Sequence, residues 1–154
     1  MRVTAFWIAQ RYVGIKEVPG TKDNPRIMAM LTLDNEWPQH DEVPWCSGFA
    51  NDVCWLLRLP RSKSLLARSW LRIGESVALD DARVGFDVVV LKRAGANQPG
   101  PEDTTAPGHV GFYAGSEPGY VLVLGGNQSN SVSVERYAVD RVLGIRRLYS
   151  ECAA

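Results

Sequence analysis

The two halves of the chain carry different hydrophobic periodicities, and this division is the strongest constraint on the fold. Apolar side chains recur at helical spacing in four segments of the first half: 4–13, 26–32, 46–57 and 65–71. The second half holds short β-branched and aromatic runs separated by turn residues, at 86–91, 109–114, 120–124, 131–137 and 143–148. Helices followed by strands predict an α+β domain with a mainly antiparallel sheet of about five strands.

Length and charge exclude several classes of protein. The 154 residues suit a single domain, and 45% hydrophobic residues supply a core. Lys plus Arg equals Asp plus Glu at 17 each, which argues against a nucleic-acid partner. No apolar run reaches the roughly 20 residues of a membrane span. The first 14 residues do not read as a signal peptide, so we expect synthesis in the cytoplasm and no membrane insertion.

Three cysteines, Cys46, Cys54 and Cys152, are too few for a disulfide scaffold. On one helix, Cys46 and Cys54 would lie about 12 Å apart along the axis, too far for a bridge. At least one thiol is therefore free. Neither the cysteines with His109 nor the acidic residues of 34–42 have the spacing of a zinc or calcium site, so we expect no metal.

Cys46 is the candidate nucleophile. Pro44 keeps the preceding residue out of the helix, so the helix of 46–57 begins near Cys46. Unpaired N–H groups and the positive end of the helix dipole stabilise a thiolate there. The alternative is a buried structural cysteine, which is how we interpret Cys54.

His109 is the candidate base, because it starts a strand that can hold an imidazole rigidly. The alternative is a surface histidine at a strand end; His40, in a loop rich in proline and acidic residues, reads as solvated. A five-residue hairpin loop at 115–119 would place His109 opposite Gly125. Asn127 is then the diagonal neighbour of His109 on the same face. Without His109, 125–128 would read as a plain turn.

The segment 94–108 is a long stretch without periodicity. It contains three prolines, Pro99, Pro101 and Pro107. A loop of this length is either functional or mobile.

Three motifs together resemble the papain-like peptidoglycan hydrolases of the NlpC and CHAP groups. They are Pro44-Trp45-Cys46-Ser47-Gly48-Phe49, Gly108-His109-Val110-Gly111-Phe112 and Leu124-Gly125-Gly126-Asn127-Gln128. An upstream Gly14-x-x-Glu17-x-x-Gly20, with Asn24-Pro25 and the Ala-Arg-Ser-Trp-Leu run of 67–71, is similar to a single-domain set found in phages and prophages. These motifs occur in the family's order over roughly 6–147.

The resemblance implies a cysteine nucleophile, a histidine base and a polar third residue, which fall on Cys46, His109 and Asn127. Many CHAP members carry a glutamate at the position of Gly125, so here the orienting role passes to Asn127 or to an unidentified group. Trp45 either lines the cleft beside the nucleophile or belongs to the core. Gln128 either stabilises the oxyanion or only completes the turn.

The implied activity is cysteine amidase or endopeptidase cleavage of peptidoglycan by one catalytic domain, 1–154, with no separate wall-binding domain and no cofactor. The resemblance favours a monomeric phage or prophage lysin that acts in the periplasm or cell wall, with a holin as its functional partner. A secreted antibacterial effector with the same chemistry is one alternative. A non-catalytic wall-binding or virion structural module is another.

Overall fold

The computed structural model describes residues 2–20, 22–34, 44–93 and 97–148. Three α-helices come first: α1 (Ala5–Gln10), α2 (Pro25–Thr32) and α3 (Cys46–Leu56). The 3₁₀ helix η1 (Ala67–Arg72) follows, and six strands complete the fold: β1 (Glu75–Val77), β2 (Asp87–Lys92), β3 (Gly108–Glu117), β4 (Tyr120–Gln128), β5 (Ser131–Ala138) and β6 (Val142–Arg147). Short 3₁₀ turns, η2 (Leu79–Asp81) and η3 (Val139–Arg141), precede β2 and β6. The predicted α+β order is confirmed.

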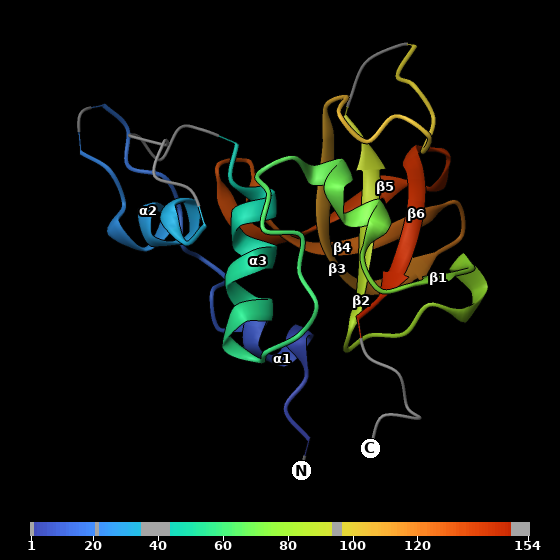
Figure 1. The fold of residues 1–154 in the computed structure, drawn as a ribbon, viewed down its shortest axis with the longest axis horizontal. Coiled ribbons are helices and arrows are strands. Elements are labelled where there is room, and N and C mark those ends of the chain that lie inside the picture. Colours follow the sequence, from blue (N-terminus) through green and yellow to red (C-terminus); the bar gives the residue numbers. More distant parts are fainter. Residues whose placement is uncertain (1, 21, 35–43, 94–96, 149–154) are drawn as a thin grey trace.

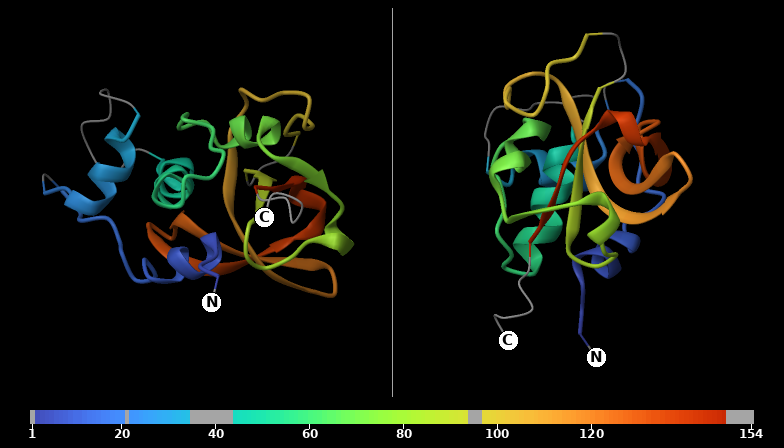
Figure 2. Two further views of the ribbon diagram at one scale, coloured as in Figure 1. Left: turned by 60° about the horizontal axis from the view of Figure 1, so that its bottom comes forward. Right: turned by 90° about the vertical axis from the view of Figure 1, so that its right-hand side faces the viewer.

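The six strands form one antiparallel sheet in the order β1-β6-β2-β3-β4-β5. In Figures 1 and 2, α3 stands between α2 and the sheet. The larger core cluster lies between the helices and the sheet, and a smaller one forms around Val89, Val123 and Ile145. Strand β2 is central, and its Val88, Val89, Val90 and Leu91 are fully buried because apolar residues cover both of its faces. In the described part of the chain, no helix is long and apolar enough to cross a membrane.

The helix starts follow from local chemistry. Asn24 caps α2 by accepting a hydrogen bond from the Arg26 N–H, and Pro25 occupies the first helical position. Helix α3 begins two residues after Pro44 and is buried along most of its length. The start of α3 near Cys46 was predicted, and α2 covers the segment 26–32 that was expected to be helical.

Close backbone approaches hold α3 in place. A Cβ at Gly48 would lie 3.4 Å from the Met30 carbonyl of α2. A Cβ at Gly126 of β4 would lie 2.6 Å from the Trp45 ring, at the start of α3. The N-terminus of α3 is therefore packed tightly against the sheet.

Three features of the fold differ from the predictions. The segment expected as an α-helix at 65–71 forms the 3₁₀ helix η1, and its three-residue turns bring Arg68 and Trp70 into the interior. Strand β1 was not predicted, because three residues carry too little periodicity. The β3–β4 hairpin turns at Pro118-Gly119 instead of over 115–119, since both strands extend further than their apolar runs.

Candidate active site

The sulfur of Cys46 lies at the first turn of α3, against strand β3. Cys46 is only 4% exposed and is hydrogen-bonded to the His109 side chain. The backbone N–H groups of Ser47 and Val110 also donate to the sulfur. N–H groups in the first turn of a helix have no carbonyl partner within it, and the helix dipole favours a negative charge there. The surroundings therefore stabilise a thiolate.

His109 is the second residue of β3. Leu91 of β2 lies opposite it in the ladder, and this pairing fixes the backbone that carries the imidazole. The sheet thus presents the ring to α3. The cysteine and the histidine therefore meet across the helix–sheet interface, although they lie 63 residues apart in the sequence.

Gln128, at the end of β4, holds the other side of the His109 ring. Gln128 Oε1 lies 3.0 Å from His109 Nε2. The amide nitrogen of Gln128 donates to the carbonyls of Val123 (3.2 Å) and Ser133 (2.7 Å), which turns the amide oxygen towards the imidazole. Because an amide oxygen only accepts, we assign the proton to Nε2. Nδ1 is then the nitrogen that can exchange a proton with Cys46.

Tyr137 completes this network from β5. Its hydroxyl donates to Gln128 Oε1 at 3.0 Å, and its ring centroid lies 5.5 Å from that of His109. Burial raises the pKa of Tyr137 to about 12, so the hydroxyl stays protonated and remains a donor at neutral pH. The amide nitrogen of Gln128 also lies 3.3 Å from Ser133 Oγ, so four hydrogen bonds besides the one to His109 orient this side chain.

The Cys46–His109 pair favours the ionised state. Burial raises the pKa of the Cys46 thiol, but the hydrogen bond and charge of His109, together with two backbone N–H groups, lower it further than burial raises it. Burial lowers the pKa of His109, but the contacts with Cys46 and Gln128 raise it above its usual value. The two groups titrate as one coupled system, and each shift favours the charged form of its group.

Among the described residues, Gln128 forms the hydrogen bond to the His109 ring, and the predicted third residue, Asn127, forms none with it. The predicted register, with Ala114 opposite Tyr120, is wrong, because Tyr120 pairs with Glu117. A β-bulge between Tyr113 and Gly115 shifts the ladder again. Near the site, Phe112 pairs with Leu124, two residues away from the predicted register, and a shift of two keeps the faces of a strand. The hairpin register therefore does not by itself decide between Asn127 and Gln128.

A second bulge, on β4, separates the two candidates. The β4–β5 register shifts between Gly125 and Gln128, and Asn127 adopts a left-handed backbone with φ +57°. Asn tolerates this conformation better than most residues. The bulge re-aims the following side chain, Gln128, which is 3% exposed and bonded to His109. The sequence left two roles open for Gln128, stabilising the oxyanion or completing the turn. In the structure its amide oxygen lies behind the imidazole instead.

There is a steric reason why this chain has Gly125 where many CHAP members carry a glutamate. A Cβ at Gly125 would lie 2.8 Å from Gln128 Oε1 and 3.2 Å from His109 Nε2. The Gln128 amide therefore fills the space that a side chain at 125 would need. The Gln128 amide oxygen, which comes from the bulge, occupies the place where a side chain at position 125 would approach the His109 ring.

Trp45 belongs to the core and does not line the cleft. It is fully buried, and its indole N–H donates to Glu17 Oε1 at 2.8 Å. Glu17 lies in the Gly14-x-x-Glu17-x-x-Gly20 segment, whose backbone is hydrogen-bonded to that of Asn130 and to that of Val132 in β5. This upstream motif thus has a structural role, since it ties the residue before the nucleophile to the edge of the sheet.

A cleft of about 490 Å³ opens at Cys46. Two chain segments line it, 64–67, which leads into η1, and 105–108, immediately before His109; we refer to these two segments as its walls. Pro44 and Arg93 complete the lining. Most of these side chains are small or apolar, so the cleft can accept an extended chain beside the thiol.

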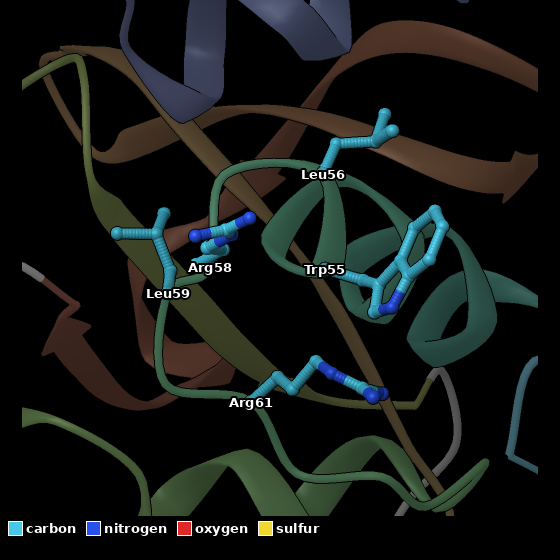
Figure 3. Close-up of a pocket in the computed structure, with 5 residues that line it drawn as sticks. All are labelled: Trp55, Leu56, Arg58, Leu59 and Arg61. Atoms are coloured by element: carbon cyan, nitrogen blue, oxygen red, sulfur yellow. The ribbon is translucent and has the colours of Figure 1, made fainter.

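A second pocket, of about 510 Å³, lies at the other end of α3 (Figure 3). Trp55, Leu56, Arg58, Leu59 and Arg61 line it. Its lining includes neither a nucleophile nor a base, so it is not a candidate for the reaction. Cys54 lies nearby in sequence but is fully buried, and burial raises its thiol pKa. Both Cys46 and Cys54 are free thiols.

No metal-binding cluster occurs in the described residues, where no three His, Cys, Asp or Glu side chains converge. Cys152 and His40 lie outside the described residues, as do the acidic residues of 35–43.

No protein-family model matches the chain, and no curated protein matches it. Among solved structures, the chain is similar to that of NlpC1 from Trichomonas vaginalis, with a TM-score of 0.57 and 18% sequence identity. The match covers 96% of this chain and 44% of that one, so the chain spans less than half the length of its structural neighbour. The α+β architecture, with α3 packed on a six-stranded antiparallel sheet, is a papain-like fold of the NlpC type.

Proposed function

We propose that this protein is a cysteine amidase or endopeptidase that cleaves an amide bond in the peptide part of peptidoglycan. The contact between Cys46 at a helix N-terminus and His109, itself held by Gln128, carries the proposal. A buried free thiol with a lowered pKa beside a fixed imidazole suits nucleophilic catalysis. The substrate class is supported by the NlpC-type fold and by the motifs around Cys46, His109 and Gln128.

The mechanism follows from the geometry. The Cys46 thiolate attacks the carbonyl carbon, and a C–S bond forms as the carbonyl oxygen takes up the electron pair. Backbone N–H groups at the start of α3 are candidate donors to this oxyanion. The His109 imidazolium protonates the amine as the C–N bond breaks, leaving a thioester. Water, deprotonated by His109, then hydrolyses the thioester and restores the thiol.

A lysin of a phage or prophage is the biological role we propose. In that role the enzyme is made in the bacterial cytoplasm as one catalytic domain and reaches the wall with the help of a holin. A secreted antibacterial effector would use the same site. A wall-binding or virion structural module would not require the ionised pair, so the test for catalysis comes first.

The test compares two cysteine variants. Cys46→Ala should lower the rate of clearing of a purified peptidoglycan suspension by at least about 10³-fold, because the nucleophile is lost. Cys54→Ala should keep activity and lower the melting temperature, because it removes a buried sulfur from the core. Full activity of Cys46→Ala would refute the proposal. Inactivity of the unmodified protein on walls of several chemistries would refute the assignment to peptidoglycan.

A further inference from the structure

The segment between β2 and β3, expected to be functional or mobile, forms one wall of the cleft. Thr105, Ala106, Pro107 and Gly108 line the cleft together with Cys46. The Asp103 carboxylate accepts hydrogen bonds from the Thr105 N–H and hydroxyl and from the Ala106 N–H, at 2.9 to 3.0 Å. The edge of this wall is therefore built by local hydrogen bonds.

Arg68 of η1 organises the same segment from beneath. It is fully buried, and its Nε donates to the Pro107 carbonyl at 3.0 Å. Its Nη1 lies 3.0 Å from the Pro99 carbonyl, 2.8 Å from that of Gly100 and 3.0 Å from that of Asp103. One side chain thus gathers four backbone carbonyls of the segment around a single cation.

This arrangement is a costly way to stabilise a fold. The four hydrogen bonds of the Arg68 guanidinium go to carbonyls, and its Nη2 is buried without a hydrogen-bond partner in the described residues. Burying a charge in this way carries a desolvation penalty, which good hydrogen bonds offset without a large net gain in stability. What the buried guanidinium provides is a fixed position for the segment before β3, which lines the cleft.

Arg68 also connects the wall to the nucleophile. Ala67, its neighbour in η1, lines the opposite wall of the cleft. Trp70 of η1 donates to Ser47 Oγ at 2.9 Å, next to Cys46. On the other side, a Cβ at Gly108 would lie 2.9 Å from Arg68 Cγ, which shows how closely the arginine packs against the residue before His109.

We propose that Arg68 is a positioning residue that clamps the two walls of the cleft and so sets its width for the substrate chain. The proposal rests on the proposed hydrolase function for its kinetic test. It also has a test that needs no substrate, because the width of the cleft limits which reagents can reach Cys46.

The kinetic test uses Arg68→Lys, with Arg72→Lys as the matched control. Arg72 lies on the same 3₁₀ helix but is exposed. Lysine keeps the charge but lacks the planar fork that reaches several carbonyls at once. The substrate is a soluble muropeptide, and each rate is divided by the concentration of Cys46 that iodoacetamide labels. In Arg68→Lys we expect KM to rise about tenfold and kcat to change less than about threefold. A lower active fraction with an unchanged KM would mean a structural role only and would overturn the proposal.

A second variant perturbs the wall at 105–108 without changing the buried Arg68 guanidinium. Asp103→Ala removes the hydrogen bonds to Thr105 and Ala106, and we expect a smaller rise in KM with little change in melting temperature. An unchanged KM in both variants would overturn the proposal, even if Arg68→Lys folds poorly.

The substrate-free test compares alkylation of Cys46 by iodoacetamide and by a bulky maleimide, with the label mapped by peptide mass. In Arg68→Lys the rate ratio of bulky to small reagent should rise several-fold, and in Arg72→Lys it should stay unchanged. An unchanged ratio in Arg68→Lys would overturn the clamp. If no muropeptide is cleaved, the proposed function fails, while this ratio still decides the role of Arg68.

Discussion

At the scale of single residues, the two described cysteines show how environment decides reactivity. Cys46 has an imidazole and two N–H groups at its sulfur, whereas Cys54 is fully buried in the core and burial raises its pKa. The thiolate is the reactive form, so its population at a given pH sets the rate of alkylation.

We therefore expect Cys46 to be alkylated at a pH below the ordinary thiol pKa of about 8.5. The lowered pKa of Cys46 keeps the thiolate present as the pH falls, and the raised pKa of His109 keeps the imidazolium present as the pH rises. The rate should thus reach a plateau between two macroscopic ionisations. In His109→Ala it should instead rise in one step at higher pH. Identical profiles would show that the histidine does not activate the thiol.

The hydrogen bond behind His109 gives a second prediction. Gln128→Ala should lower kcat about 10- to 100-fold, because the imidazole loses the group that fixes its tautomer and angle. Asn127→Ala, the matched control in the same bulge, should retain most of the activity. The reverse ranking would restore the residue that the sequence favoured.

The idea that Gln128 fills the space beside Gly125 can be tested by moving the hydrogen-bond acceptor for His109 from position 128 to position 125. Gly125→Ala should lower activity, because the new Cβ would displace the Gln128 amide. In the double variant Gly125→Glu with Gln128→Gly, the carboxylate could take the place of the amide, and we expect more activity than in Gly125→Glu alone. Equal activity of these last two variants would contradict the idea that the two side chains compete for one space.

At the scale of elements, the sequence was sufficient where one local cause decides the structure. Asn24-Pro25 determines where α2 starts, and Pro44 determines where α3 starts, so the position of Cys46 could be predicted. His109 could be placed on a strand because the β-branched and aromatic run at 109–114 is a local pattern as well. The third residue could not, because its identity depends on the bulge at Gly125–Gln128. No short pattern of apolar residues reveals such a shift.

The contact between α3 and β4 is testable as an element-scale feature. Gly126→Ala should destabilise the protein by about 1–3 kcal/mol, because its Cβ would overlap the Trp45 ring and the Phe49 side chain. Gly144→Ala is the control, since its Cβ would meet only the flexible end of Leu71, at 3.0 Å. Chemical denaturation would measure both. Equal stability of the two variants would contradict the tight seating of α3 on the sheet.

At the scale of the whole molecule, the papain-like arrangement explains how a helix and a sheet build one site. Helix α3 carries Cys46, β3 carries His109 and β4 carries Gln128, while 64–67 and the segment before β3 line the cleft. Catalysis should therefore depend on this interface and on access to the substrate.

Access to the wall can be tested in living cells. Fused to a bacterial export signal, the protein should lyse a Gram-negative host, because peptidoglycan lies outside the inner membrane. The exported Cys46→Ala variant should leave culture turbidity unchanged. Lysis by both proteins would point to damage that does not need the thiol.

The most direct test of the proposed activity is to digest purified peptidoglycan in ¹⁸O-labelled water and to identify the fragments by mass. Thiolate attack followed by hydrolysis should yield pairs of fragments with a new amine on one and a new carboxyl on the other. The carboxyl should carry one heavy oxygen, and Cys46→Ala should release neither fragment. Fragments that end in new reducing sugars, or label incorporation that persists in Cys46→Ala, would contradict cysteine-dependent amide hydrolysis.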